Sequence, residues 1–389
     1  MRQLALPHPA LAGEPGAVGL RRFDFELAAA GDEAELRAFS RQADMPGAIR
    51  FAFDRAPDYF AALRVEGRES AVLICRESSS GRLIGTGHRS FKPAWVNGRP
   101  AVVGYLSGLR LDRSVRSGHL LARGYAALRQ RLAGGSERFY LTSIMEHNGP
   151  AKAVVASGRC GLPVYHDFGR FCCMALSLRG RNQSRPSSEL LVRQATQADG
   201  TAVVEFLNRE GPSRQFFPAY RLEDFGVPGG LLSHLAWKDV FLAFRASELI
   251  GVLAAWDQRA FRRWQVTGYA PWLRWLRLPL NLVAGLRGMP LLPRPGSSLN
   301  YFVLSLACIR ENDPAVFKAL LETILREKRA QFSFFMAGLH ERDPLLPELL
   351  AQPHVPLNSR LYVVAWPESA EAVQRLDRDR VPYLELGGL

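Results

Sequence analysis

Cysteine is scarce in this sequence, and its placement excludes two kinds of scaffold. The five cysteines show no Cys-x-x-Cys spacing and stand at Cys75, Cys160, Cys172, Cys173 and Cys308. An odd number without paired spacing argues against a disulfide framework and against a structural zinc site. We therefore expect buried thiols in a reducing, cytoplasmic setting, and no metal.

Long apolar runs are also missing. No uncharged apolar stretch approaches the roughly 18 residues that a membrane-spanning helix needs, so we expect no transmembrane segment. Residues 1–22 lack a continuous apolar core and contain three prolines. We interpret them as a flexible leader rather than a secretory signal.

Acidic residues are outnumbered by basic ones. The 389 residues include 50 Lys and Arg against 37 Asp and Glu, a formal net charge of +13, and the excess is largely arginine. This balance favours anionic partners such as phosphorylated cofactors. Nucleic acid is not expected, because the charge is dispersed and no helix-turn-helix or zinc pattern is present.

A weak internal repeat divides the chain. Asp32 and Asp199 follow similar short strands and are 167 positions apart, while Gly85 and Gly251 each close a Leu-Ile-Gly triplet and are 166 apart. Hydrophobic residues make up 47% of the chain, enough to bury more than one core. The repeat and the length together predict two related domains.

The second copy is longer than the first. Tyr105 is matched with Tyr301, 196 positions on, which leaves room for an insertion of about 29 residues. The aromatic and basic segment at about 262–295 fits that insertion. The expected division is a leader at 1–22, a first domain at 23–178, a polar linker at 179–188 and a second domain at 189–389.

Strands and helices alternate in each copy. In the first copy the pattern predicts a strand at 23–28, a helical region from Asp32 to about 65 and a hairpin at 71–77 and 82–91. A strand at 100–112, a helix at 118–132, a strand at 138–145, a helix at 149–157 and a strand pair at 163–178 are predicted to follow. This order predicts an α/β (α+β) fold in which each domain has a mixed central sheet flanked by helices.

The segment LSGLRLDRSVRSGHLLARGYAAL, followed by SIMEHNGPA, resembles the GNAT superfamily of N-acetyltransferases. In that family a basic, glycine-containing turn between a central strand and a helix holds the pyrophosphate of CoA on main-chain N–H groups. Here His119 and Leu121 stand where the family has small residues. The resemblance implies pantetheine contacts at Leu109, Arg110 and Leu111, pyrophosphate contacts at Arg116, Ser117, Gly118, His119 and Leu120, and a further pantetheine contact at Asn148.

Asn148 also has a purely structural interpretation, because Asn followed by Pro in the first turn caps a helix. The family often places a tyrosine seven residues after this Asn as general acid, and here that position is Val155. The acid or base of catalysis is therefore left open. The candidates are Glu146, Tyr165 and Tyr105, whereas His88, His166 and Tyr125 are interpreted as ordinary core or surface residues.

The second copy lacks the phosphate loop. Glu311 and Asp313 stand in the corresponding place and would repel a diphosphate, and Pro314 removes one N–H donor. We expect a degenerate GNAT-like domain that does not bind CoA. Its insertion is interpreted as an arm that bridges the domains and buries Trp272 and Trp275; the alternative is a basic amphipathic surface for a membrane or an acidic partner.

The resemblance implies an N-acetyltransferase. An acetyl or other acyl group would pass from acyl-CoA to an amine on a small molecule or peptide by direct attack, with the Leu111 N–H polarising the thioester carbonyl. One alternative is a non-catalytic module that binds acyl-CoA or a partner, which thioester turnover would exclude. Another is a FemX-like transferase that uses aminoacyl-tRNA, which CoA binding without tRNA retention would exclude. The oligomeric state is left open.

Overall fold

The computed structural model describes residues 22–42, 48–112, 115, 118–131, 139–149, 151–152, 161–178, 189–287 and 289–389. We call residues 22–178 the first half and residues 189–389 the second half. The expected linker at 179–188 and all but the last residue of the expected leader at 1–22 lie outside the described residues, so the domain division stays a prediction.

The first half contains seven strands and three helices among its described residues. They are β1 (Phe23–Leu27), α1 (Glu33–Gln42), β2 (Ile49–Asp54), α2 (Tyr59–Leu63), β3 (Glu69–Glu77), β4 (Leu83–Val96), β5 (Arg99–Leu111), α3 (Gly118–Arg131), β6 (Tyr140–Met145) and β7 (Val164–Ser177).

The second half repeats this order with additions. Its elements are β8 (Leu190–Gln194), α5 (Gly200–Glu210), β9 (Phe225–Gly226), β10 (Leu232–Ser233), β11 (Val240–Arg245), β12 (Glu248–Trp256), β13 (Arg263–Tyr269), α6 (Pro271–Leu286), β14 (Tyr301–Ile309), α7 (Pro314–Lys328), β15 (Phe334–His340), α8 (Leu346–Leu350), β16 (His354–Pro356), β17 (Ser359–Ala365) and α9 (Ala370–Gln374).

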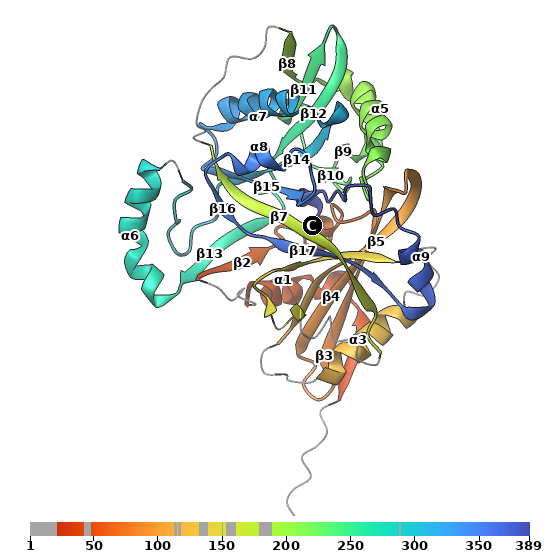
Figure 1. Ribbon diagram of the computed structural model, residues 1–389. Coiled ribbons are helices and arrows are strands. Elements are labelled where there is room, and N and C mark those ends of the chain that lie inside the picture. The colour runs from red at the N-terminus through yellow and green to blue at the C-terminus, as the bar shows by residue number, and fades with distance from the viewer. Residues whose placement is uncertain are drawn as a thin grey trace, which may run out of the picture.

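The strands of both halves join in one mixed sheet of 13 strands, which runs through the middle of the molecule (Figure 1). Its order is β1-β3-β4-β5-β6-β17-β7-β15-β14-β12-β11-β8, with β16 paired to β7. The order reads alike from both ends: five strands of one half are followed by the last strand of the other half, so that β7 and β17 are exchanged. The α/β class is confirmed, but the two expected sheets are continuous, because each half donates its last strand to the centre.

A single strand replaces the strand pair that the sequence pattern predicted at 163–178. β7 pairs with β17 over its first part and with β15 over Phe171–Ser177. Gly169 has a φ of +98° at the register shift between these two parts. A Cβ there would lie 2.5 Å from the His340 ring. The glycine therefore forms a bulge that redirects the strand instead of a turn that reverses it.

Alternating side chains place helices on both faces of the first half's strands. Leu73 joins the cluster under α3 with Leu106 and Tyr125. Its neighbours Val72 and Ile74 point the other way and pack with Leu36 of α1 and with α2. Tyr105, next to Leu106, therefore lies on the face opposite α3.

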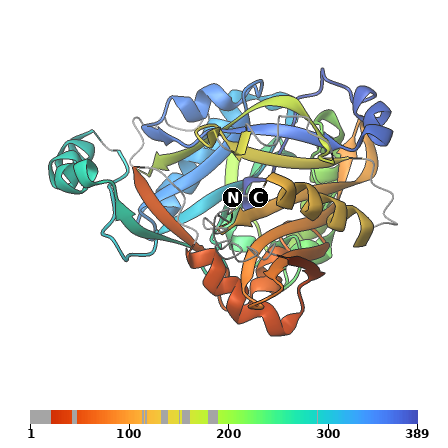
Figure 2. The ribbon, with the colours of Figure 1, turned by 90° about the horizontal axis from the view of Figure 1, so that it is seen from below.

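The insertion joins the halves through a second, small sheet. β13 pairs antiparallel with β2, and the Trp264 ring lies 4.6 Å from that of Phe53. The bridging role is thus observed for β13. The expected burial of the arm's other tryptophans is wrong, because Trp272 is 58% and Trp275 83% exposed on α6. α6 stands away from the main body in both views (Figures 1 and 2).

Candidate functional site

Strands β5 and β6 separate soon after they meet. Their parallel pairing is limited to Gly104–Tyr140 and Tyr105–Leu141. Beyond that point the Thr142 hydroxyl donates to the Leu106 carbonyl at 2.8 Å and spans the widening gap. The end of β5 then continues beside β4 alone. Leu109 and Leu111, two of the expected pantetheine contacts, are 52% and 42% exposed along this open edge.

A bulge at Gly108 bends β5 where the strands separate. The register with β4 shifts between Thr86 and His88, and Gly108 has a φ of +60°. A Cβ at this position would lie 2.2 Å from the His88 ring. Only glycine fits here, because the position combines a left-handed backbone with close packing.

Helix α3 begins at Gly118, a few residues after β5 ends. Its first turn contains no acidic residue, so its N–H groups form an electropositive end. His119 is exposed there, whereas Leu120 is buried beside Cys75 and Ile84. Arg116 and Ser117 lie outside the described residues, and the pyrophosphate contacts remain a prediction.

Asn148 caps the start of a helical turn, as its structural interpretation predicts. Its side-chain oxygen accepts a hydrogen bond from the Ala151 N–H at 3.2 Å, as a helix cap does. The Arg110 side chain points away from the gap and donates to the Ser40 carbonyl at 2.6 Å. Any pantetheine contact at Arg110 therefore falls to its backbone. Val155 lies outside the described residues.

The three candidate catalytic residues do not converge. Glu146 forms an ion pair with Arg170 at 2.7 Å. Tyr165 is hydrogen-bonded to Tyr125 on the α3 face, and burial raises its pKa. Tyr105 lies on the opposite face with its hydroxyl 3.5 Å from that of Ser143, and burial raises its pKa as well. Of the three, Tyr105 alone borders the gap between β5 and β6 on the face away from α3.

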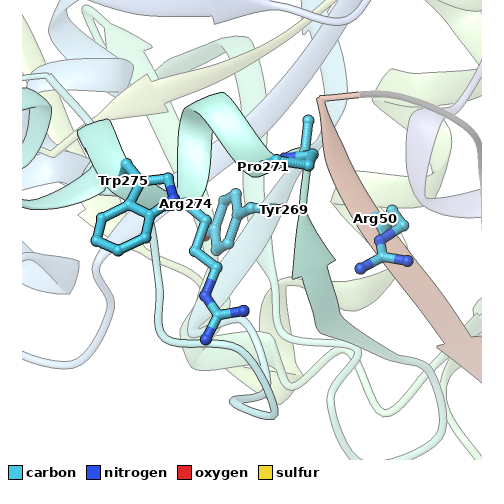
Figure 3. A pocket seen from close by; sticks show the side chains of 6 residues that line it. Arg50, Tyr269, Pro271, Arg274 and Trp275 are labelled. Carbon is cyan, nitrogen blue, oxygen red and sulfur yellow. The ribbon is translucent and has the colours of Figure 1, made fainter.

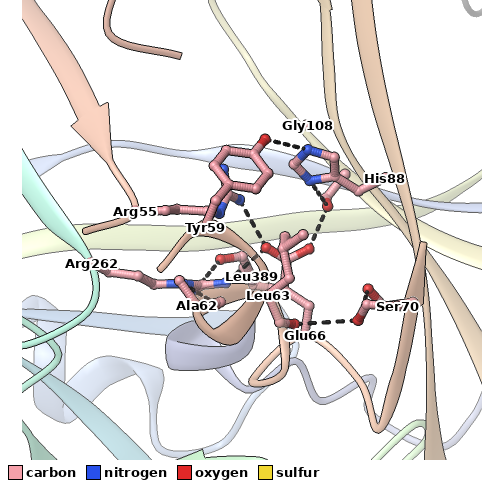
Figure 4. Close-up of polar contacts among 12 residues, drawn as sticks. Arg55, Tyr59, Ala62, Leu63, Glu66, Ser70, His88, Gly108, Arg262 and Leu389 are labelled. Atoms are coloured by element: carbon pink, nitrogen blue, oxygen red, sulfur yellow. Dashed lines mark hydrogen bonds and ion pairs between the residues drawn. The ribbon is translucent and has the colours of Figure 1, made fainter. Parts of the chain in front are cut away.

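A buried polar network lies on that same face and connects the two halves (Figure 4). Glu66 is fully buried and forms ion pairs with Arg55 at 2.9 Å and with Arg262 of the second half at 2.7 Å. The Ser107 hydroxyl donates to the other Glu66 oxygen at 2.5 Å. Sequence reasoning missed this network.

Hydrogen bonds extend the network across β4 to α2. The His88 ring lies 3.3 Å from the Ser107 hydroxyl through Nδ1 and 2.8 Å from the Tyr59 hydroxyl through Nε2. Since Ser107 donates to Glu66, all partners are satisfied when His88 Nδ1–H donates to Ser107 and Tyr59 donates to Nε2. The chain Tyr59–His88–Ser107–Glu66 therefore fits a neutral imidazole.

The charges of the network agree with this assignment. Burial alone would raise the pKa of Glu66, but Arg55 and Arg262 outweigh it and lower the pKa to about 2. Burial, assisted by Arg55, lowers the pKa of His88 to about 3. Lys92 lies above the Tyr105 ring, and burial lowers its pKa to about 8 against the opposing effect of Glu385. Near neutral pH, Glu66 is thus ionised and His88 neutral.

The corresponding region of the second half is closed. β14 and β15 separate in the same way, here after three pairs instead of two, but the N–H of Leu306, at the equivalent bulge, donates to Glu385 at 3.0 Å. The Asp313 carboxylate accepts from the Ala315 N–H at 2.9 Å and forms an ion pair with Arg245. A carboxylate of the chain therefore occupies the N-terminus of α7.

Two further findings concern the described residues as a whole. They contain no group of three or more His, Cys, Asp or Glu side chains placed to hold a metal ion. None of the helices in these parts of the chain is both long and apolar enough to cross a bilayer.

Comparison with known proteins supports the fold. No family model matches the sequence, and no curated protein matches it. Solved structures do match. They include Saccharomyces cerevisiae N-myristoyltransferase with bound myristoyl-CoA, at 11% identity and a TM-score of 0.55 over 89% of this chain and 84% of that chain.

A second structure of the yeast enzyme, with myristoyl-CoA and inhibitors, matches at 11% identity and a TM-score of 0.54, over 96% of this chain and 89% of that one. A GCN5-related N-acetyltransferase from Anabaena variabilis matches at 10% identity and a TM-score of 0.48, over 88% and 72% of the two chains. The chain thus shares the fold of the yeast N-myristoyltransferase over most of the length of both proteins.

Proposed function

We propose that this protein transfers an acyl group from an acyl-CoA to a primary amine, at the gap between β5 and β6. The observation that carries the proposal is the asymmetry of the two halves. In the first half an open strand edge leads towards a helix N-terminus without acidic residues. In the second half Glu385 and Asp313 occupy the equivalent positions. One half is therefore suited to an anionic cofactor and the other is not.

The cofactor would lie along the open edge of β5. The N-terminus of α3 faces the diphosphate, and the backbone of residues 109–111 supplies partners for the amide groups of the pantetheine. The thioester then reaches the bulge at Gly108, and a β5 N–H at the bulge, rather than that of Leu111 three residues on, polarises its carbonyl. Acyl-CoA is a co-substrate here, and its contacts rest on backbone groups.

The chemistry is a direct displacement. The neutral amine attacks the thioester carbon, a C–N bond forms, the C–S bond breaks, and CoA leaves as a thiolate that takes up a proton. An acyl intermediate on one of the described cysteines is disfavoured, because Cys75, Cys172, Cys173 and Cys308 are all buried. Burial raises the pKa of each of these thiols, to about 11 for Cys75 and about 12 for Cys173 and Cys308. A buried thiol above its usual pKa is a poor nucleophile.

The amine would approach from the face opposite α3. That face holds Tyr105, the half-buried Ser107 and the charged network behind them. Lys92 has a pKa of about 8, which is closer to neutral pH than the pKa of Glu66 or of His88. We assign it the role of exchanging the proton that the acceptor's ammonium group must lose before the neutral amine attacks.

Calorimetry with CoA, acetyl-CoA and myristoyl-CoA tests the binding step, and CoA release in the presence of an amine panel tests turnover. The two donors are both included because the sequence resemblance favours acetyl transfer, whereas the yeast neighbour has bound myristoyl-CoA. We expect one cofactor per chain.

The key variant is Gly118→Asp. A carboxylate at a helix N-terminus stabilises the helix but repels a diphosphate, so the melting temperature should hold while CoA affinity falls by about tenfold or more. The matched control is Ala315→Asp at the closed N-terminus of α7, which should change neither. Absence of binding to the wild-type protein refutes the proposal, as does equal affinity in Gly118→Asp.

A further inference from the structure

Helix α6 exposes most of its large apolar side chains to solvent and contacts the protein through a narrower side of mixed polarity. Leu273 is its one buried residue. Along the same inner side, Asn281 exchanges hydrogen bonds of 2.9 and 2.7 Å with the backbone of Leu292, and Arg277 approaches the Leu292 carbonyl. This arrangement differs from an ordinary surface helix, whose apolar stripe faces the core, because the larger apolar side of α6 faces solvent.

The outer side, which we call the α6 face, is apolar along the whole helix. Its members share an exposed large side chain at helical spacing opposite Leu273 and Asn281. They are Trp272 (58% exposed), Trp275 (83%), Leu276 (47%), Leu278 (70%), Leu282 (69%), Val283 (43%) and Leu286 (82%). So many large apolar groups on one exposed surface indicate a contact site rather than ordinary surface variation.

The segment that carries the α6 face has charge of one sign. No Asp or Glu occurs between Asp257 and Glu311. Exposed arginines flank the helix on both of its ends and on the paired strands: Arg50, Arg263, Arg274, Arg287 and Arg294. A partner must therefore offer an apolar layer that can take up these side chains, and negative charge that can pair with the arginines.

A pocket lies at the start of the helix. Its cavity of about 760 Å³ is lined by Arg50, Tyr269, Ala270, Pro271, Arg274 and Trp275. Figure 3 shows the Arg274 side chain beside the rings of Tyr269 and Trp275, with the Arg50 side chain on the neighbouring strand across from them. Neither arginine forms an ion pair with a described acidic residue. Two cations above an aromatic wall suit a phosphate that is attached to an apolar chain.

We propose that the α6 face is a docking surface for an anionic phospholipid bilayer, in which α6 lies parallel to the surface. The leucines and tryptophans enter the boundary between headgroups and acyl chains, and Arg50 and Arg274 bind a lipid phosphate. A second copy of the chain fits poorly. A symmetric interface would bring the same arginines together, and this segment has no acid to pair with them. The proposal is independent of the acyl-transfer proposal.

Vesicle co-sedimentation with the full chain tests the surface. The wild-type protein should bind vesicles of phosphatidylcholine mixed with phosphatidylglycerol, bind phosphatidylcholine alone much more weakly, and lose affinity as salt rises. The double variant Trp275→Ser with Leu282→Ser should lower the partition coefficient by about tenfold or more, because both side chains are mostly exposed. Its matched control is Leu191→Ser with Val227→Ser, two exposed apolar residues elsewhere, which should bind normally.

The charge contribution is measured separately. Arg50→Ala and Arg274→Ala should each weaken binding to the anionic vesicles by about fivefold without changing binding to neutral ones. Arg326→Ala, an exposed arginine on α7, is the control and should have no effect. Melting temperatures should be unchanged in all these variants.

Two outcomes overturn the proposal. One is a wild-type protein that binds anionic and neutral vesicles equally or not at all. The other is a dimer in sedimentation velocity that Trp275→Ser dissociates, with no vesicle binding, because it assigns the α6 face to a second copy.

Discussion

Replacing Arg262 by methionine should destabilise the protein more than any exposed arginine change. The Arg262 side chain is 3% exposed and pairs with Glu66, which is 0% exposed. It also donates to the carbonyl groups of Ala62, Gly387 and Leu389. Methionine fills a similar volume but leaves a fully buried carboxylate with Arg55 as its remaining charged partner.

The size of the effect follows from the burial of the pair. Removing one partner of a buried ion pair reduces the free energy of unfolding by about 3–5 kcal/mol. For a chain of this length, about 3 kcal/mol corresponds to a fall in the melting temperature on the order of 4 °C. The loss should appear in urea unfolding curves and in calorimetry.

The controls separate charge from volume. Arg263→Met changes the adjacent, exposed arginine and should alter the free energy of unfolding by less than about 0.5 kcal/mol. Glu66→Gln should be at least as damaging as Arg262→Met, because it leaves two buried guanidinium groups without a counter-charge. Equal stability of the Arg262→Met and Arg263→Met proteins would refute the view that the network holds the halves together.

Three more predictions follow from the site. Gly108→Ala should lower the free energy of unfolding by about 3 kcal/mol in denaturant titrations, because the new Cβ would clash with His88 at a φ of +60°; a neutral result would contradict the packing at the bulge. Since the folded-state pKa of His88 lies at about 3, below the usual 6.5, the unfolded chain binds the proton first, and stability should fall as pH drops from about 6.5 towards 3. Glu66 adds a further loss between about 4.5 and 2, and His88→Gln should remove the first of the two phases. The four described cysteines should resist iodoacetamide at pH 8 in the folded protein, and rapid labelling of these positions by mass spectrometry would contradict their burial.

Periodic patterns in the sequence were enough to predict much of the fold. The hairpin at 71–77 and 82–91 corresponds to β3 and β4, and the helix expected at 118–132 is α3. Exchange of β7 and β17 between the halves was not predictable, because local patterns define strands but not their partners.

The match of Tyr105 to Tyr301 shows how register can slip in such an alignment. Gly85 pairs with Leu111 and Gly251 pairs with Ile309, which makes Val303 the counterpart of Tyr105. The sequence match is displaced by two residues. A shift of two preserves the alternation of faces along a strand, so the apolar pattern gives no warning of it.

The candidate site was predicted in part. The open end of β5 and the start of α3 lie where the sequence motif indicates. The network of Glu66 and Arg262 joins residues 196 positions apart and follows no local spacing. The outward side of α6 was missed for another reason: apolar residues at helical spacing indicate an amphipathic helix but not which side meets the protein.

A crystal structure with acyl-CoA bound would show whether the first half alone holds the cofactor. We expect one cofactor per chain, with the diphosphate at the N-terminus of α3, the pantetheine along residues 109–111 of β5 and the thioester near Gly108. Density for the cofactor at Asp313 and the start of α7, or an empty β5–β6 gap in crystals grown with saturating acyl-CoA, would contradict this expectation.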